Sequence, residues 1–303
     1  MGKIKTIITV IIALYLISFV ASKLLTSSSL KDELITNGIA IVKVNGPIVI
    51  NVGTNILGQG PSSSDTILEN LKKAEENKGV KAIILEINSP GGTVIASKEI
   101  ADKVKNIEKP TVAFIREVGA SGAYWVASAA DLIVADELSI TGSIGVISSY
   151  LQFSGLLDDY NVTYERLVTG EFKDTGTPYK ALTDRERNLL QTKLDLIELK
   201  FVADVASNRN MPLSEVQKLA DGSFYLGIEA KQNGLIDLNG NRDLAIEKAK
   251  ELANLTNGNV IEYVKKPSLL NIFEKLTAES FYSIGQGLGE SLKTKEEFAI
   301  LAK

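Results

Sequence analysis

Strand-like and helix-like segments alternate along the first half of the chain, and this alternation restricts the folds that it can adopt. The predicted strands, rich in apolar and β-branched residues, are 39–44 (IAIVKV), 80–87 (VKAIILEI), 111–115 and 132–135. The predicted helices are 65–77 and 94–107, followed by a helix of small residues after Ser121. Strands separated by helices of about 10–15 residues indicate βαβ units. We therefore predict an α/β fold with a mostly parallel sheet.

The second half of the chain is predicted to be mainly helical. One strand is expected at 163–168, before a loop that contains Lys173. The longest helical pattern runs over 183–208 and opens with a capping box, Thr183 to Glu186. Three shorter helical segments are predicted at 211–221, 224–233 and 242–255.

Two residue types are absent from the 303-residue chain, cysteine and histidine. Without cysteine there is no disulfide, thiol nucleophile or thiolate metal site. Without histidine there is no Ser-His-Asp triad and no imidazole metal ligand. A hydrolase with a serine nucleophile would need another base, and lysine is the best-known substitute. The net charge of −4 argues against a nucleic-acid partner.

An uncharged stretch of 17 residues lies between Lys5 and Lys23 (TIITVIIALYLISFVAS). This is the short end of the range that spans a bilayer as a helix. Lys3 and Lys5 precede it, so the positive-inside rule places the N-terminus in the cytoplasm and the rest of the chain outside. The alternative is a cleaved signal peptide with a weak site near Ala21. Both interpretations export the body of the protein.

Three glycine-containing turns each follow a predicted strand: Ser89-Pro90-Gly91-Gly92, Gly119-Ala120-Ser121-Gly122 and Thr141-Gly142-Ser143. Sites in open α/β sheets gather at the carboxyl ends of the strands. Ser121 can be a nucleophile there, or simply the N-cap of the following helix. The Pro-Gly-Gly turn can offer N–H groups to an oxyanion, or be only a turn. Ser143 can likewise be only a serine in a turn.

Taken together with Gly170-Glu171-Phe172-Lys173-Asp174, these motifs resemble the signal peptide peptidase A family. The similarity runs from about residue 39 to 255 and includes 220–222 (ADG) and 233–237 (NGLID). The resemblance implies a ClpP/crotonase-like fold of repeated ββα units, plus an N-terminal transmembrane helix. The expected organisation is a membrane anchor over 1–25, a linker over 26–38, a protease domain over 39–257 and a C-terminal tail over 258–303.

The resemblance also implies roles for individual residues. Ser121 corresponds to the nucleophile, Lys173 to the general base and Ser143 to the serine that positions the lysine amine. Gly92 and Gly122 correspond to the backbone donors of the oxyanion hole, with Gly91 a weaker candidate. No metal or cofactor is implied. The single copy of the motifs resembles the short form of the family, which assembles into homo-oligomeric rings whose dyads are shared between protomers.

A lysine base must be neutral, whereas lysine in water holds its proton at pH 7. Glu171 and Asp174 flank Lys173 and would favour its charged form, so we expect both carboxylates to point away from it.

The predicted function is a membrane-anchored serine endopeptidase that degrades remnant signal peptides or other hydrophobic peptides at the extracytoplasmic face. Three alternatives remain at this point. One is a ClpP-like membrane protease that acts with stomatin-like proteins. The others are a crotonase-type acyl-CoA enzyme and an inactive peptide-binding scaffold.

Overall fold

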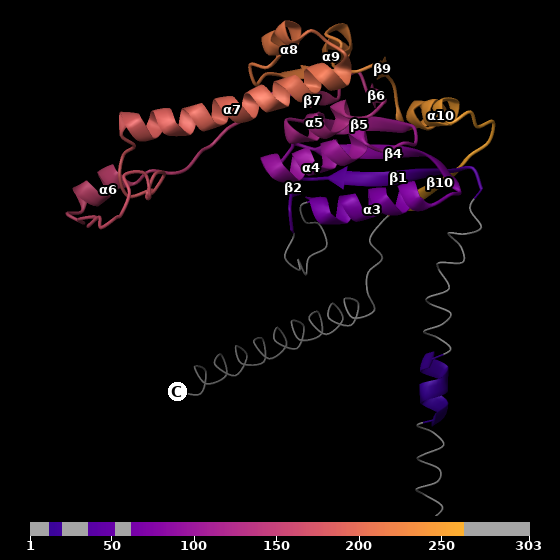
Figure 1. Cartoon of the computed structure of the whole chain (residues 1–303), viewed down its shortest axis with the longest axis horizontal. Helices are drawn as coiled ribbons and strands as arrows, with labels where there is room; N and C mark the ends of the chain where they lie inside the picture. Colours follow the sequence, from indigo (N-terminus) through magenta and orange to yellow (C-terminus); the bar gives the residue numbers. More distant parts are fainter. Residues whose placement is uncertain (1–11, 20–35, 52–61, 264–303) are drawn as a thin grey trace, which may run out of the picture. The chain divides into compact units, whose positions relative to one another are not determined.

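The computed structural model describes residues 12–19, 36–51 and 62–263, and its centre is a mostly parallel β-sheet (Figure 1). The main strands follow the order β10-β1-β4-β5-β6-β9. Their bounds are Asn259–Tyr263 for β10, Gly38–Asn45 for β1, Val80–Ser89 for β4, Thr111–Ala120 for β5, Leu132–Ala135 for β6 and Leu238–Asn239 for β9. Every pairing along this path is parallel, as the sequence predicts.

Helices cover both faces of the sheet, which explains why its strands are almost continuously apolar. In β1, Ala40 and Val42 belong to one core cluster, while Ile39 and Ile41 belong to another. Helices α3 (Ser64–Glu76), α4 (Val94–Lys105) and α5 (Gly122–Ser128) contribute to the first cluster. Helix α10 (Arg242–Leu252) packs on the opposite face.

A short strand, β7 (Ile140–Gly142), leaves the main path and pairs with the C-terminal end of β5. It also pairs in antiparallel fashion with β8 (Phe224–Leu226). A separate small ladder joins β2 (Ile48–Val49) to β3 (Ser62–Ser63). The turns that follow β5 and β7 therefore lie at the same edge of the sheet.

The long helix α7 (Asp184–Arg209) has two different halves. Its C-terminal half buries Phe201, Val202 and Val205, whereas Glu186 is the only buried residue near its start. The capping box predicted at Thr183 is present, and the helix ends at Asn210 in a left-handed conformation. The other helices of this region are α6 (Ser154–Asp159), α8 (Leu213–Leu219) and α9 (Gly227–Gln232).

Two sequence predictions are wrong. Residues 163–168 do not form a strand, because this exposed segment has no partner strand among the described residues that could satisfy its backbone. The predicted helix over 224–233 is instead β8 followed by α9, since Phe224 to Leu226 pair with β7.

The two ends of the chain are described only in part. Residues 12–19 are helical, and the rest of the predicted membrane anchor lies outside the described residues, as does most of the predicted linker. Within the described ranges, no helix combines the length and the apolar character needed to cross a bilayer. Strand β10 falls in the stretch assigned to the tail and pairs with β1, while residues 264–303 lie outside the described part.

Candidate active site

Ser121 occupies a strained position between β5 and α5. Its φ of 53° and ψ of −127° are rarely adopted by a residue with a side chain. It lies at the N-cap position, but its side chain makes no capping hydrogen bond. Its backbone N–H donates to the carbonyl of Gly142 at 2.8 Å. The hydroxyl is therefore presented at the sheet edge rather than used to cap the helix.

The Pro-Gly-Gly turn packs tightly against Ser121. A Cβ on Gly91, where φ is +103°, would lie 2.9 Å from the Cβ of Ser121. A Cβ on Gly92 would lie 1.9 Å from the carbonyl oxygen of Ile48. Ile48 bonds to the turn on both sides of Gly92, through the Gly91 carbonyl and the Thr93 N–H. This pairing leaves the N–H of Gly92 itself without an acceptor in the described part of the chain.

Gly122 begins α5, where the first N–H groups of a helix have no intrahelical acceptor. A Cβ on Gly91 would lie 2.9 Å from the nitrogen of Gly122, and a Cβ on Gly122 would lie 3.4 Å from the nitrogen of Gly92. The two nitrogens predicted to hold an oxyanion thus lie close together, next to Ser121.

Ser143 lies directly after β7 and also has a positive φ, 49°. The pairing of Ala120 with Gly142 brings it to the same edge as Ser121. Its N–H donates to Ser223 at 2.8 Å, and its hydroxyl donates to the Gly222 carbonyl at 3.3 Å. Ser143 is therefore held by the 222–223 turn.

One cavity of about 560 Å³ is lined by four of the predicted site residues, Gly92, Ser121, Gly122 and Ser143. Other lining residues come from α4, α5, α7 and the 220–222 turn. They include Ser97, Trp125, Glu198, Phe201 and Asp221. The rings of Trp125 and Phe201 stack with centroids 4.5 Å apart and tie α5 to α7. No cluster able to hold a metal ion occurs among the described residues.

Lys173 is not part of this cavity. It is exposed and lies in a run of turns over residues 171–176, which we call the lysine loop. The loop packs against the start of α7, because Glu171 pairs with Arg185 and Thr175 donates to Glu186. The structure of a single chain thus brings together Ser121, Ser143, Gly92 and Gly122, but not Lys173.

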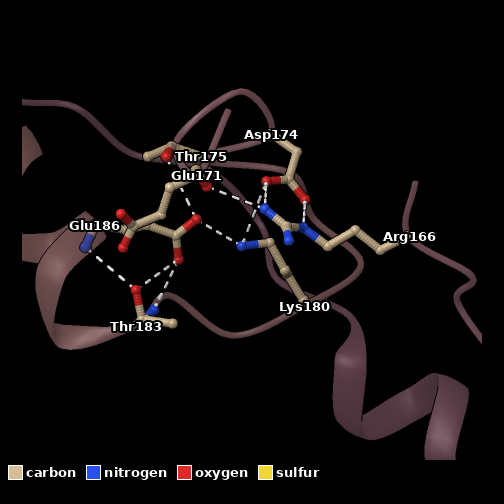
Figure 2. A network of polar contacts seen from close by, with 7 residues as sticks. All are labelled: Arg166, Glu171, Asp174, Thr175, Lys180, Thr183 and Glu186. Carbon is tan, nitrogen blue, oxygen red and sulfur yellow. Dashed lines mark hydrogen bonds and ion pairs between the residues drawn. The ribbon is translucent and has the colours of Figure 1, made fainter. Parts of the chain in front are cut away.

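A network of charged residues holds the lysine loop (Figure 2). Arg166 binds both carboxylate oxygens of Asp174, and one of these contacts is 2.7 Å long. Lys180 bridges Asp174 and Glu186. Glu186 also accepts hydrogen bonds from the backbone N–H and the hydroxyl of Thr183 at 2.9 and 3.0 Å.

The same network lowers the pKa of both carboxyl groups. The hydrogen bond from Arg166 lowers the pKa of Asp174 to about 2. The hydrogen bond from Lys180, helped by the backbone of Thr183, lowers the pKa of Glu186 to about 2. As expected from the sequence, Glu171 and Asp174 pair with cations other than Lys173 in the described structure.

Sequence reasoning missed two polar residues of the cavity, Ser97 and Glu198. Ser97 is fully buried on α4, and nothing in the local sequence indicates that its helix faces Ser121. The sequence does suggest that Glu198 has no ion-pair partner on its own helix, because no lysine or arginine stands three or four residues away.

Comparison with known protein families identifies two matches. The profile of peptidase family S49 matches residues 103–256, and the profile of Clp protease matches residues 47–135. Together they cover the strands and turns that carry Gly92, Ser121, Ser143 and the lysine loop.

Several relatives share long stretches of sequence. A protein of Methanocaldococcus jannaschii named as a protease is 34% identical over 96% of both chains. A protein of Enterococcus faecium named as signal peptide peptidase SppA is 36% identical over 81% of this chain and 72% of its own length. Protease 4 of Haemophilus influenzae is 34% identical, and the aligned part is 73% of this chain and 35% of that protein.

Among solved structures, a membrane-bound stomatin-specific protease superposes with a TM-score of 0.50. The match covers 77% of this chain and all of that one, at 15% sequence identity. This similarity concerns the fold.

Proposed function

Because the chain belongs to peptidase family S49 and is a serine peptidase, we propose that Ser121 and Lys173 form its dyad, supplied by different copies of the chain. The observation that carries the proposal is the separation of the two residues. Ser121 lies in the cavity with two free N–H groups, while Lys173 is anchored at the start of α7.

The length of α7 argues against a dyad within one chain. The lysine loop contacts Arg185 and Glu186, whereas Glu198 lines the cavity. Glu186 and Glu198 are twelve residues apart on a helix (198 − 186), which corresponds to about 18 Å of helix axis. A lysine side chain does not extend that far. A neighbouring copy could instead place its lysine loop over this cavity.

In the proposed reaction, the Oγ of Ser121 attacks the scissile carbonyl while a neutral Lys173 takes the hydroxyl proton. The new bond joins Oγ to the carbonyl carbon, and the negative charge moves to the carbonyl oxygen. The N–H groups of Gly92 and Gly122 would hold that oxygen. Lys173 then protonates the leaving amine, and water hydrolyses the acyl-enzyme.

Ser143 would orient the amine of Lys173 in the assembled protein. Its hydroxyl lies on the cavity wall and is fixed by the Gly222 carbonyl. Covering by a neighbouring copy would also remove water from the lysine, which favours the neutral form that a base requires.

The proposed setting is a membrane surface, with the N-terminus in the cytoplasm and the catalytic domain outside. The uncharged stretch between Lys5 and Lys23 supports an anchor. The proposed substrates are remnant signal peptides or other hydrophobic peptides, in line with the name of the Enterococcus faecium relative. The resemblance to the stomatin-specific protease is one of fold, so it does not favour stomatin as the substrate of this chain.

Mixing two inactive variants tests the shared dyad. Ser121→Ala and Lys173→Ala are each expected to abolish peptide hydrolysis while retaining the wild-type circular dichroism spectrum. Co-expressed at equal levels, they should recover about a quarter of wild-type activity, because each intact site takes its serine from one copy and its lysine from the next. A dyad within one chain predicts no recovery, and activity in either single variant would contradict the dyad itself.

A further inference from the structure

The cavity beside Ser121 has a marked negative character that the proposed reaction does not use. Glu198 and Asp221 line it, and no lysine or arginine is among its lining residues in the described structure. Asp221 is engaged locally, since it accepts a hydrogen bond from the N–H of Ser223 at 2.9 Å. Glu198 makes no hydrogen bond or ion pair within the described residues.

The helix itself offers Glu198 no partner. The residues three and four positions away are Leu194, Asp195, Phe201 and Val202, none of them cationic. Lys200, the nearest lysine along the helix, pairs with Asp204. The carboxylate of Glu198 is thus available to a molecule that enters the cavity.

Ser97 provides an independent sign of a ligand. The residue is 0% exposed and lines the same cavity, and its buried Oγ has no hydrogen-bond partner among the described residues. Buried hydroxyl groups nearly always have a partner. The Oγ lies 2.2 Å from the position that a Cβ on Gly122 would occupy, so it is immediately beside the proposed oxyanion hole.

Part of the cavity wall is aromatic, although Trp125 and Phe201 are each at most 2% exposed. The stacked rings of Trp125 and Phe201 both line it. An aliphatic stem can pack on such a surface while its charged end reaches a carboxylate. A long side chain with a positively charged end matches this combination of groups.

We propose that the cavity binds a basic side chain of the peptide substrate, arginine in preference to lysine. The guanidinium donates to the carboxylate of Glu198 and to the hydroxyl of Ser97, and its methylene groups pack on the aromatic wall. The residue bound is the one that supplies the scissile carbonyl. This inference rests on Ser121 as the nucleophile, and it suits signal peptides because their N-terminal regions are basic.

Lys173 of another copy is a poorer match for Glu198. A carboxylate beside that lysine would favour its charged form, whereas the proposed base has to be neutral. The acidic side of the cavity is therefore assigned to the substrate.

The test compares two fluorogenic peptides that differ only in arginine or citrulline, its neutral analogue, before the scissile bond. The wild type should cleave the arginine peptide with a kcat/KM at least about tenfold higher, as expected for a charge-assisted hydrogen bond. Glu198→Gln should bring this ratio close to one, and Ser97→Ala should lower it by a smaller factor. Glu215→Gln, which removes an exposed charge from α8, is the matched control and should leave the ratio unchanged.

A wild-type ratio near one would overturn the proposal. So would an equal loss of kcat/KM for both peptides in Glu198→Gln, because Glu198 would then serve the reaction and not the choice of substrate. Binding of the two peptides to full-length Ser121→Ala, measured by calorimetry, does not depend on hydrolysis. A preference for arginine there that disappears in Ser121→Ala/Glu198→Gln supports the inference even if the dyad proposal fails, and equal affinities refute it.

Discussion

Ser121 and Ser143 both have positive φ values, which is unusual for residues with side chains. Such strain persists only where the surroundings fix the backbone. Here the pairing of β5 with β7 provides that restraint, since Ser121 donates to Gly142 and Ser143 donates to Ser223. Backbone hydrogen bonds thus hold both serines in their strained conformations, and the Ser143 hydroxyl is also held by the Gly222 carbonyl.

The glycine at position 92 is required by space. Gly92→Ala places a methyl group 1.9 Å from the Ile48 carbonyl, so the turn has to move. We expect a loss of about 1–3 kcal/mol in the free energy of unfolding, measured by urea denaturation, together with loss of peptide hydrolysis.

Gly155→Ala is the matched control for that change. Gly155 lies in α6, and nothing lies within 4 Å of its would-be Cβ. Alanine there should raise stability by about 0.5–1 kcal/mol, because glycine costs more conformational entropy in a helix. Equal effects of the two substitutions would show that Gly92 is not sterically required.

At the scale of elements, the network of Asp174, Lys180 and Glu186 joins the lysine loop to the first turn of α7. Folding favours the charged forms of Asp174 and Glu186, because the pKa values of both carboxyl groups are lowered to about 2. An unfolded carboxyl group titrates near 4. The stabilisation is therefore complete above about pH 4 and is lost as the pH falls toward 2.

Acidification should consequently loosen the lysine loop between about pH 4 and 2. We expect faster amide hydrogen exchange over residues 170–186 in this interval, while the core strands keep their protection. Asp174→Asn should show the faster exchange already at pH 7. If this variant protects the loop as well as the wild type does, the network does not hold it.

The main sheet could be predicted from the sequence because its strands are buried on both faces. Residues 80–87 are apolar except for Lys81 and Glu86, and this run corresponds to most of β4. The error at 163–168 has the opposite origin, since β-branched residues do not reveal whether a partner strand exists. Likewise, the turn motifs indicated Ser121, Ser143 and Gly92. That Glu198 lines the same cavity depends on how α7 crosses α5, and the sequence does not show this crossing.

At the scale of the whole molecule, the segment between β7 and α7, residues 147–183, exposes many apolar side chains in a single copy. Ile147 is 88% exposed and Leu167 is 97% exposed. Exposed apolar surface of this kind marks an interaction site. It supports the proposed assembly of several copies, in which this segment carries the lysine loop to a neighbour.

Leu167→Glu tests this assembly directly. A charge in the proposed interface should shift the protein to smaller species in analytical ultracentrifugation and reduce peptide hydrolysis in parallel. Leu138→Glu alters another exposed leucine outside this segment and should change neither property. If Leu167→Glu leaves the sedimentation profile unaltered, the segment is not an interface.

The stack of Trp125 on Phe201 fixes one end of α7 to the catalytic core, and Glu186 fixes the lysine loop to the other. A helix of 26 residues is about 39 Å long and resists bending. In the proposed assembly, the length of α7 would set the distance between Ser121 of one copy and Ser121 of the next. If the proposed ring forms, the number of copies that close it depends on this length, and adding one helical turn to α7 would alter that number or leave the ring open.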